Sequence, residues 1–389
     1  MKQHKKNFSR KDAGFTLTEL IIYMGLLGIL LTMVFSTFIP VMQSGSRQWR
    51  IGETKMETDV GLDLLRGDLE HAGFGLPWEF PVGVTPAPYS EPALLPDTPN
   101  VPRAVNSQDN SASSMNNADY LVIRATNVAI NDSSQKWGWL GRNAAHGVLI
   151  ETLSDDAFDD SGVDADRVIV IRPAVSPGEF HRLVLNGTAY FTKPAIADLT
   201  PFAPPETPND PNGERYLVYS LGTTDPRRPF NRTDYYINAP SAASPLPAHC
   251  APGTGTLLKA TVNQADDDFT TIPIVDCVAD FQVVYYLDTD NDGGWDTRAN
   301  ASGLNGLTAK QIREQVKSIR CYVLSHEGGA DQTYTHPNAN INVGDIAEDG
   351  VTLQANGGRA FDLNAFIGAT WPRYRWKVYG IAVTPRNLQ

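Results

Sequence analysis

The sequence predicts an α+β protein in which one long N-terminal helix packs on an antiparallel β-sheet domain with large loop insertions. An uncharged apolar run occupies residues 20–39, and a helical pattern of apolar residues continues beyond it. Short β-branched and aromatic runs then alternate with turn residues as far as the C-terminus. The 32 glycines and 27 prolines also suit a loop-rich β domain better than a helical bundle.

The first element is a membrane helix. Residues 20–39 read LIIYMGLLGILLTMVFSTFI, and together with residues 15–18 they are long enough to cross a bilayer core. The leader MKQHKKNFSRKDAG carries lysines and arginines against a single acid, Asp12, so the positive-inside rule keeps the N-terminus in the cytoplasm. Gly14 precedes the apolar run, whereas the small cleavage-site residue of an ordinary secretory signal follows it.

Glu19 lies at the edge of this apolar run. A carboxylate in such a segment is expensive to bury, and it therefore marks a function and calls for a positively charged partner.

The segment GFTLTE (residues 14–19), followed by about twenty apolar residues, resembles the type III signal of type IV prepilins and pseudopilins. The resemblance implies that a prepilin peptidase cuts after Gly14 and N-methylates Phe15, and that the helix is retained. It also implies that Glu19 pairs with the N-terminal amine of a neighbouring subunit. Opposite charges in a low-dielectric medium cost less together than apart.

Beyond the membrane, Trp49, Met56, Val60 and Leu64 recur at spacings of seven and four, which predicts an amphipathic helix that needs a domain to pack against. Pro40 is expected to kink or loosen the helix. The stop signals in AGFGLP (residues 72–77) end it near residue 71. The predicted organisation is leader 1–14, transmembrane helix 15–40, amphipathic helix 41–72, irregular connection 73–118 and β-rich domain 119–389.

Ten short β-branched or aromatic runs in the β-rich domain are predicted to be strands. A second β subdomain is one alternative for their arrangement. The expected strands are residues 120–125, 147–152, 167–172, 180–185, 215–221, 234–237, 256–260, 278–287, 315–325 and 374–385.

Several segments of this region resemble PilW-like minor pilins, whose relatives by layout are the J-type minor pseudopilins of type II secretion. They include RPFNRTDYYI, CAPGTGTLLKA, VDCVADFQVVYYLDTDNDG, VKSIRCYVL and RYRWKVYGIAVTPRNL. The resemblance implies the pilin fold and a minor subunit that primes pilus assembly. Its implied partners are prepilin peptidase, other minor and major pilins and an inner-membrane assembly platform.

Two alternatives remain at this point. A J-type pseudopilin would serve a secretion pseudopilus, and a tip adhesin or receptor would bind through loops at residues 77–117 and 326–371. Whether it is a priming minor pilin or a tip adhesin, the chain is expected to start as a single-pass inner-membrane protein and later to carry its β domain outside the cell.

Three cysteines, Cys250, Cys277 and Cys321, suit an oxidising compartment. We favour a Cys250–Cys277 disulfide, which would contribute roughly 3 kcal/mol by constraining the unfolded chain. Cys321 lies in the alternating run IRCYVL and is expected to be a buried free thiol. Other pairings stay open.

The strongest chemical motif is DTDNDGGWD (residues 288–296), which reproduces the first nine positions of an EF-hand calcium loop. The candidate Ca²⁺ ligands are Asp288, Asp290, Asp292 and Asp296. Ala299 stands where the bidentate glutamate belongs, so the site is weaker, completed from elsewhere, or an ordinary hairpin turn. The aspartates between residues 155 and 166 lack regular spacing and are read as an acidic loop.

We expect neither an enzyme nor a specific nucleic-acid ligand. The seven histidines show no metal spacing, no nucleophile elbow or phosphate loop is present, and Ser325-His326-Glu327 is read as a strand-ending loop. The formal charge of −12 becomes −16 once the leader, with its net +4, is removed, which disfavours nonspecific binding to phosphates.

Overall fold

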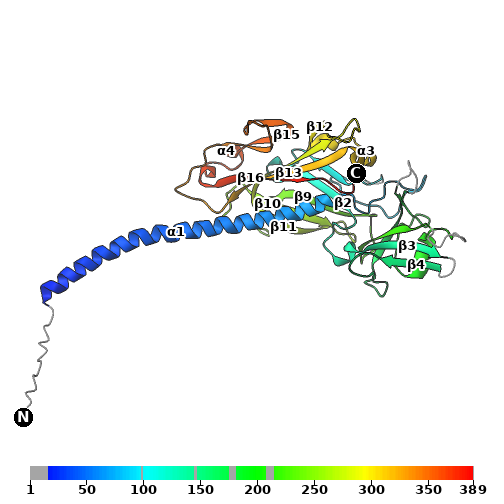
Figure 1. The fold of residues 1–389 in the computed structure, drawn as a ribbon, viewed down its shortest axis with the longest axis horizontal. Coiled ribbons are helices and arrows are strands. Elements are labelled where there is room, and N and C mark those ends of the chain that lie inside the picture. Colours follow the sequence, from blue (N-terminus) through cyan, green and yellow to red (C-terminus); the bar gives the residue numbers. More distant parts are fainter. Residues whose placement is uncertain (1–15, 98–99, 144–146, 175–180, 207–213, 389) are drawn as a thin grey trace, which may run out of the picture. The chain divides into compact units, whose positions relative to one another are not determined.

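The computed structural model describes residues 16–97, 100–143, 147–174, 181–206 and 214–388. The chain divides into two compact units, Met1–Glu53 and Thr54–Gln389. The N-terminal helix α1 (Leu17–Glu70) contributes to both units, and its helical assignment continues through Pro40 (Figure 1).

In the first unit, the apolar side chains of α1 are exposed along the helix, as at Leu20, Ile29 and Phe38. Its length and composition are those of a helix that can cross a membrane, and no other helix of the described residues meets that test. The first unit therefore has the character of a membrane anchor.

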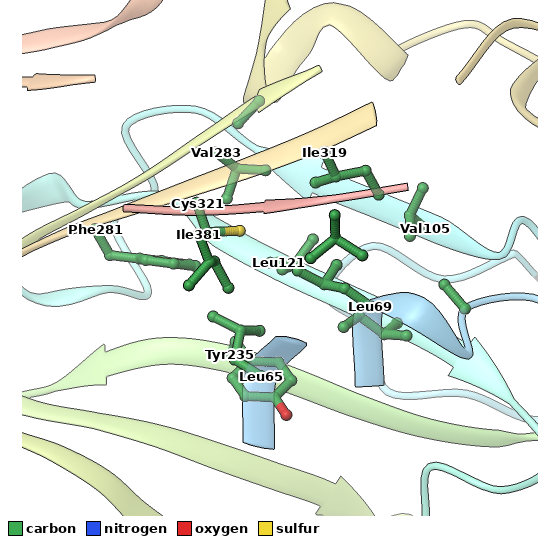
Figure 2. Close-up of a cluster of buried hydrophobic side chains, with 14 of the residues drawn as sticks. Leu65, Leu69, Val105, Leu121, Tyr235, Phe281, Val283, Ile319, Cys321 and Ile381 are labelled. Carbon is green, nitrogen blue, oxygen red and sulfur yellow. The ribbon is translucent and has the colours of Figure 1, made fainter. Parts of the chain in front are cut away.

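In the second unit, the C-terminal part of α1 packs on the main sheet through Leu62, Leu65 and Leu69, which are at most 5% exposed. Figure 2 shows Leu65 and Leu69 in the core cluster with Leu121 and Tyr235 of the sheet. Burying three leucines supplies several kcal/mol of hydrophobic stabilisation.

The predicted packing stripe was wrong. Trp49, Met56 and Val60 are more than 70% exposed, and Leu64 is 40% exposed. Gly61 explains the difference, because a Cβ there would lie 1.9 Å from the carbonyl oxygen of Ile274. The helix backbone approaches the sheet at this glycine, so the leucines that follow it on the same face are the ones that become buried.

Asp68 adds a polar anchor to the same helix face. Its carboxylate accepts a hydrogen bond of 2.5 Å from the Tyr235 hydroxyl and pairs with Lys259 Nζ at 2.6 Å. Burial raises the pKa of Asp68, and the Lys259 ammonium opposes that shift. These two partners give a buried carboxylate the compensation it needs.

The main sheet is antiparallel, in the order β1-β2-β9-β10-β11-β13-β16, with β12 paired to β11 (Figure 1). Its strands are β1 (Val105–Gln108), β2 (Tyr120–Ala125), β9 (Asn231–Asn238), β10 (Gly255–Val262), β11 (Phe269–Leu287), β12 (Thr297–Asn300), β13 (Val316–Glu327) and β16 (Arg375–Val383). The α+β prediction is confirmed.

A second antiparallel sheet has the order β4-β3-β8-β5-β6, with β7 paired to β5. Its own core includes Leu140, Val168, Val170 and Val218, so the second sheet packs around a separate cluster within the compact unit Thr54–Gln389. The strands are β3 (Trp137–Asn143), β4 (Gly147–Thr152), β5 (Arg167–Arg172), β6 (Arg182–Leu183), β7 (Phe191–Thr192) and β8 (Tyr216–Gly222).

A separate hairpin and short helices complete the described fold. The hairpin is β14 (Asn340–Ile346) with β15 (Leu353–Asp362), and the α-helical turns are α2 (Ile196–Leu199), α3 (Ala309–Gln315) and α4 (Leu363–Phe366). The 3₁₀ turns are η1 (Met115–Asn117), η2 (Asp132–Gln135), η3 (Thr200–Phe202), η4 (Ala301–Leu304) and η5 (Trp371–Arg373).

The segment expected to be irregular, residues 73–118, contains strand β1, which pairs with β2. Buried charged side chains hold another part of it. Glu91 accepts hydrogen bonds from Arg124 (2.7 Å) and Arg232 (2.9 Å), and all three side chains are fully buried. Burial works against the Glu91 carboxylate, but the two guanidinium groups win and lower its pKa. A loop with poor periodicity is therefore fixed to β2 and β9.

Candidate functional site

Glu19 closes a reciprocal cap at the start of α1. The Thr16 amide and hydroxyl donate to Glu19 Oε2 at 3.1 and 2.9 Å, and the Glu19 amide donates to Thr16 Oγ1 at 3.3 Å. This is a capping box, and a negative charge in the first turn also suits the helix dipole. The exposed carboxylate thus has a partner within its own chain. Gly14 and Phe15 lie outside the described residues.

Cys250 and Cys277 form a disulfide, which confirms the predicted pair. Cys250 precedes β10, and Cys277 lies within β11, where the β10–β11 register shifts. Cys277 itself has a φ of 58°. A strand irregularity of this kind re-aims a side chain, and here it turns Cys277 toward Cys250. Cys321 is a free, fully buried thiol whose pKa is raised by burial, as a small core residue would be.

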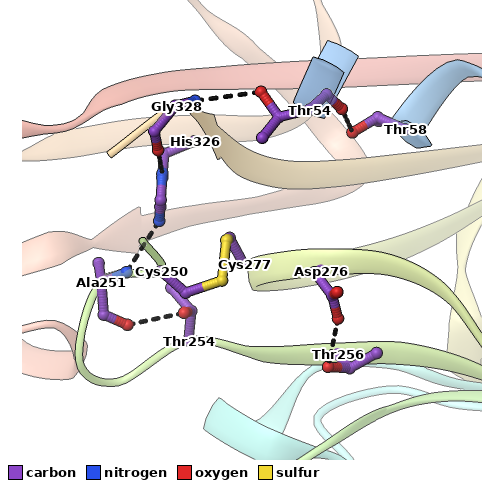
Figure 3. Close-up of a disulfide and its surroundings, with 10 residues drawn as sticks. All are labelled: Thr54, Thr58, Cys250, Ala251, Thr254, Thr256, Asp276, Cys277, His326 and Gly328. Carbon is purple, nitrogen blue, oxygen red and sulfur yellow. Dashed lines mark hydrogen bonds between the residues drawn. A yellow bond between two sulfur atoms is a disulfide. The ribbon is translucent and has the colours of Figure 1, made fainter. Parts of the chain in front are cut away.

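His326 joins the disulfide loop to α1 through backbone groups (Figure 3). The Ala251 amide donates to His326 Nε2 at 2.9 Å, and His326 Nδ1 lies 3.0 Å from the Gly328 carbonyl oxygen. The Gly328 amide in turn donates to Thr54 Oγ1 at 3.1 Å. Nε2 must accept, so Nδ1 donates and the ring is neutral. Burial lowers the pKa of His326 to about 3.

The Asp288–Asp296 segment is the turn of a hairpin between β11 and β12. The structure brings together Asp288, Asp290 and Asp296, each of which offers an oxygen within 4.8 Å of the others. Asp292 is not part of this group, and its Oδ1 accepts a hydrogen bond from the Gly294 amide at 2.7 Å. Ala299 belongs to β12 and pairs with Tyr285, so the twelfth EF-hand position supplies no ligand.

The turn is already rich in hydrogen bonds. Asp296 accepts bonds from both the amide and the hydroxyl of Thr289 and from the Thr297 hydroxyl, and these donors lower its pKa to about 2. Asp288 pairs with Lys317 Nζ at 3.2 Å. Lys317 was not expected at this turn, because it comes from β13 and no spacing in the sequence links it to the aspartates.

Two family models match the chain. The Type IV Pilus-assembly protein W model matches residues 234–387, from β9 to just beyond β16. The prokaryotic N-terminal methylation motif matches residues 9–35, which include the leader's cleavage motif and the start of α1. These two matches support a PilW-like type IV pilin. No curated protein and no solved structure matches it.

The PilW match covers most of β9 and all of β10 to β16, whereas β1 and β2 of the main sheet lie outside it. The second sheet, built from residues 137–222, lies outside both matched ranges. This pilin is a type IV pilus-associated minor subunit, and its family implies that it is a substrate of prepilin peptidase and contacts other pilins.

The acidic segment of the pilin around residues 155–166 is organised by one buried side chain. Asp166 pairs with Lys136 Nζ at 3.0 Å and accepts hydrogen bonds from the Asp159 amide and the Ser133 hydroxyl. The other aspartates in this stretch are exposed. In the part of the chain that the structure describes, the segment holds no group of three convergent carboxylates.

Proposed function

We propose that this PilW-like pilin primes assembly of a type IV pilus and stays at one end of the filament. The observation that carries the proposal is Glu19, an acid in the first turn of α1 at the start of an uncharged apolar run, on a chain whose residues 234–387 match the PilW family. Within this proposal the chain is a structural subunit without catalytic activity.

The proposed sequence of events begins at the inner membrane. Prepilin peptidase cuts after Gly14 and methylates Phe15, which leaves a positively charged amine four residues before Glu19. The Glu19 carboxylate then exchanges its hydrogen bonds with Thr16 for the amine of an incoming pilin. That exchange replaces two hydrogen bonds from uncharged Thr16 donors by an ion pair in a medium of low dielectric, where the pair is strong.

The proposal is tested by counting filaments. We expect deletion of the chain to reduce the number of pili per cell, with the remaining pili of normal length, because priming acts before elongation. Immunogold labelling should mark one filament end. Labelling along the whole shaft would contradict the proposal, and so would loss of protein secretion with normal piliation, which is the outcome for a secretion pseudopilin. Mass spectrometry of the purified chain checks the methylated Phe15 terminus.

A second proposal concerns the hairpin turn, which we propose as a Ca²⁺ site. The support is the convergence of Asp288, Asp290 and Asp296 oxygens within 4.8 Å. Hard carboxylate oxygens suit this ion, which would compete with Lys317 for Asp288. The ion would tie the turn together, and its loss would loosen the β11–β12 hairpin.

Trp295 lies inside the turn, so terbium luminescence excited through this ring reports binding in the full chain in detergent. Terbium binds in place of Ca²⁺, so we expect added Ca²⁺ to displace it and lower the luminescence. Asp288→Asn should remove the luminescence. Asp292→Asn is the matched control and should retain it, because Asp292 is outside the convergent group. Equal loss in both variants would indicate a different ligand set, and no luminescence in the unmodified chain would disprove the site.

A further inference from the structure

A small cavity of about 330 Å³ lies beside α3 and is lined in part by Asp288, Asn291 and Gly293 of the hairpin turn. Its walls include three cations, Lys310, Arg313 and Lys317, two acids, Asp288 and Glu314, and the ring of Trp78. A basic excess is unusual in a chain whose formal charge is −12. The excess suggests that the cavity receives an anion.

Two of the three cations in the cavity wall form ion pairs with its two acids, and the third, Arg313, does not. Lys317 Nζ lies 3.2 Å from Asp288, and Lys310 Nζ lies 3.7 Å from Glu314. Within the described residues, Arg313 has no carboxylate and no other hydrogen-bond acceptor for its guanidinium group. That group lies 4.6 Å from the centre of the Trp78 ring. The net charge of the wall is therefore that of one arginine.

Arg313 is held in place without being paired. Trp78 also stacks on the ring of His181, with the ring centroids 4.5 Å apart. Burial lowers the pKa of Arg313 to about 10, and Glu314 opposes this shift. A guanidinium that is partly removed from water, and whose donors meet no protein acceptor within the described residues, can bind a carboxylate through charge-assisted hydrogen bonds.

We propose that this cavity binds a carboxylate group, with Arg313 as the two-pronged donor and Lys310 and Lys317 as the surrounding positive field. The planar guanidinium matches a carboxylate through two parallel hydrogen bonds. A single excess charge suits a monoanion better than a phosphate dianion, since Asp288 and Glu314 already line the wall. This inference does not depend on the priming role.

The rest of the ligand has room beside the cavity. A second hollow of about 610 Å³ shares Trp78 and Lys310 with the first and continues toward Asn100 and Arg103. The carboxylate can therefore belong to a free acid or to an acidic side chain on a partner's extended segment. The two sources differ in size, and the experiment separates them.

The test is the rate of phenylglyoxal labelling of Arg313 in the full chain in detergent, followed by mass spectrometry. Propionate represents the free acid, and the peptide acetyl-Gly-Glu-Gly-amide represents the partner segment. Propionamide, the matching glutamine peptide and phosphate are the controls at constant ionic strength. We expect a carboxylate probe to slow labelling of Arg313 at least about threefold, and labelling of exposed Arg215 to stay unchanged.

Variants identify the role of the surrounding charges. Lys310→Gln should raise the propionate concentration for half-protection by about threefold, as expected for one partly exposed charge. If Arg313 does not label at all, the readout becomes the melting temperature, which the glutamate peptide should raise in the unmodified chain and in Arg215→Gln but not in Arg313→Gln.

The probe that best protects Arg313 from phenylglyoxal identifies the source of the carboxylate. Protection by propionate alone indicates a small acid, and stronger protection by the glutamate peptide indicates a partner segment. The proposal is overturned if neither acid protects better than its amide, or if phosphate protects best.

Discussion

At the residue scale, Glu19 shows how one side chain can satisfy a local rule and a functional one together. Sequence reasoning marked it as a costly acid at a membrane boundary. The structure adds that it completes a capping box with Thr16. A cap needs only an acceptor, whereas pairing with an amine needs a charge, so the two roles separate by substitution.

Glu19→Gln should keep the cap and remove the charge. We predict normal processing and a loss of pili as severe as in Glu19→Ala, because a neutral amide cannot compensate the charge of a neighbour's amine. Pili per cell and the mass of the mature N-terminus measure the two effects. Normal piliation of the glutamine variant with loss in the alanine variant would show that capping is the role of Glu19.

His326 makes a pH prediction at the same scale. Its pKa falls from 6.5 in the unfolded chain to about 3 in the folded one, because the ring is buried between Ala251 and Gly328. The unfolded chain therefore binds the proton first. The contribution of the neutral His326 ring to the free energy of unfolding is complete above pH 6.5 and is lost as the pH falls toward 3. The free energy of unfolding then changes by up to about 1.4 kcal/mol per pH unit.

His326→Gln tests this slope. We expect a lower free energy of unfolding at neutral pH and a shallower decline between pH 6.5 and 5, measured by urea unfolding of the detergent-solubilised chain. His181, whose pKa burial also lowers, retains its own share of the decline in both proteins. An unchanged slope would count against a neutral, buried His326.

At the element scale, α1 was placed correctly and its buried face was not. Apolar spacing identified the stripe through Met56, Val60 and Leu64, which is exposed. The face that packs runs through Gly61, Leu62, Leu65 and Leu69, where a glycine admits the backbone. A periodic pattern of apolar side chains gives no information on how closely two backbones approach. Glycine has no side chain and so does not contribute to the pattern.

Two glycines of α1 provide a matched comparison. Gly61→Ala places a methyl group against the Ile274 carbonyl, and we predict a loss of about 1–3 kcal/mol in the free energy of unfolding. At Gly67 an added Cβ meets nothing within 4 Å, so Gly67→Ala should be neutral or gain up to about 1 kcal/mol from helix propensity. Equal effects in urea unfolding would argue against the close approach at Gly61.

At the scale of the whole molecule, long-range links hold the β domain together. The disulfide joins cysteines separated by 27 positions, and the buried Glu91 links residues from three parts of the chain. The loop between the cysteines contains all of β10 and the first part of β11. A cross-link there limits the freedom of the unfolded chain around two central strands.

We predict that replacing Cys250 and Cys277 together by alanine lowers the free energy of unfolding by roughly 3 kcal/mol, in line with the loop that the bond closes. Urea unfolding of the oxidised chain and the double variant measures the difference. Addition of a reductant should lower the stability of the unmodified chain and leave the double variant unchanged. A loss of stability in the variant under reductant would point instead to Cys321.

The sequence by itself determined the apolar helix, the prepilin signal, the fold class and most strands, because these depend on local composition and short periodic patterns. It favoured the cysteine pair but left other pairings open. It missed β1, β3, β7, β12 and the β14–β15 hairpin, whose strands are defined by their pairing with neighbouring strands. Tertiary structure alone decided which face of α1 is buried and that Lys317 meets Asp288. It alone decided that, among the residues that the structure describes, no carboxylate forms an ion pair with Arg313. Each of these depends on side chains from distant positions, and no spacing along the chain encodes their distance in space.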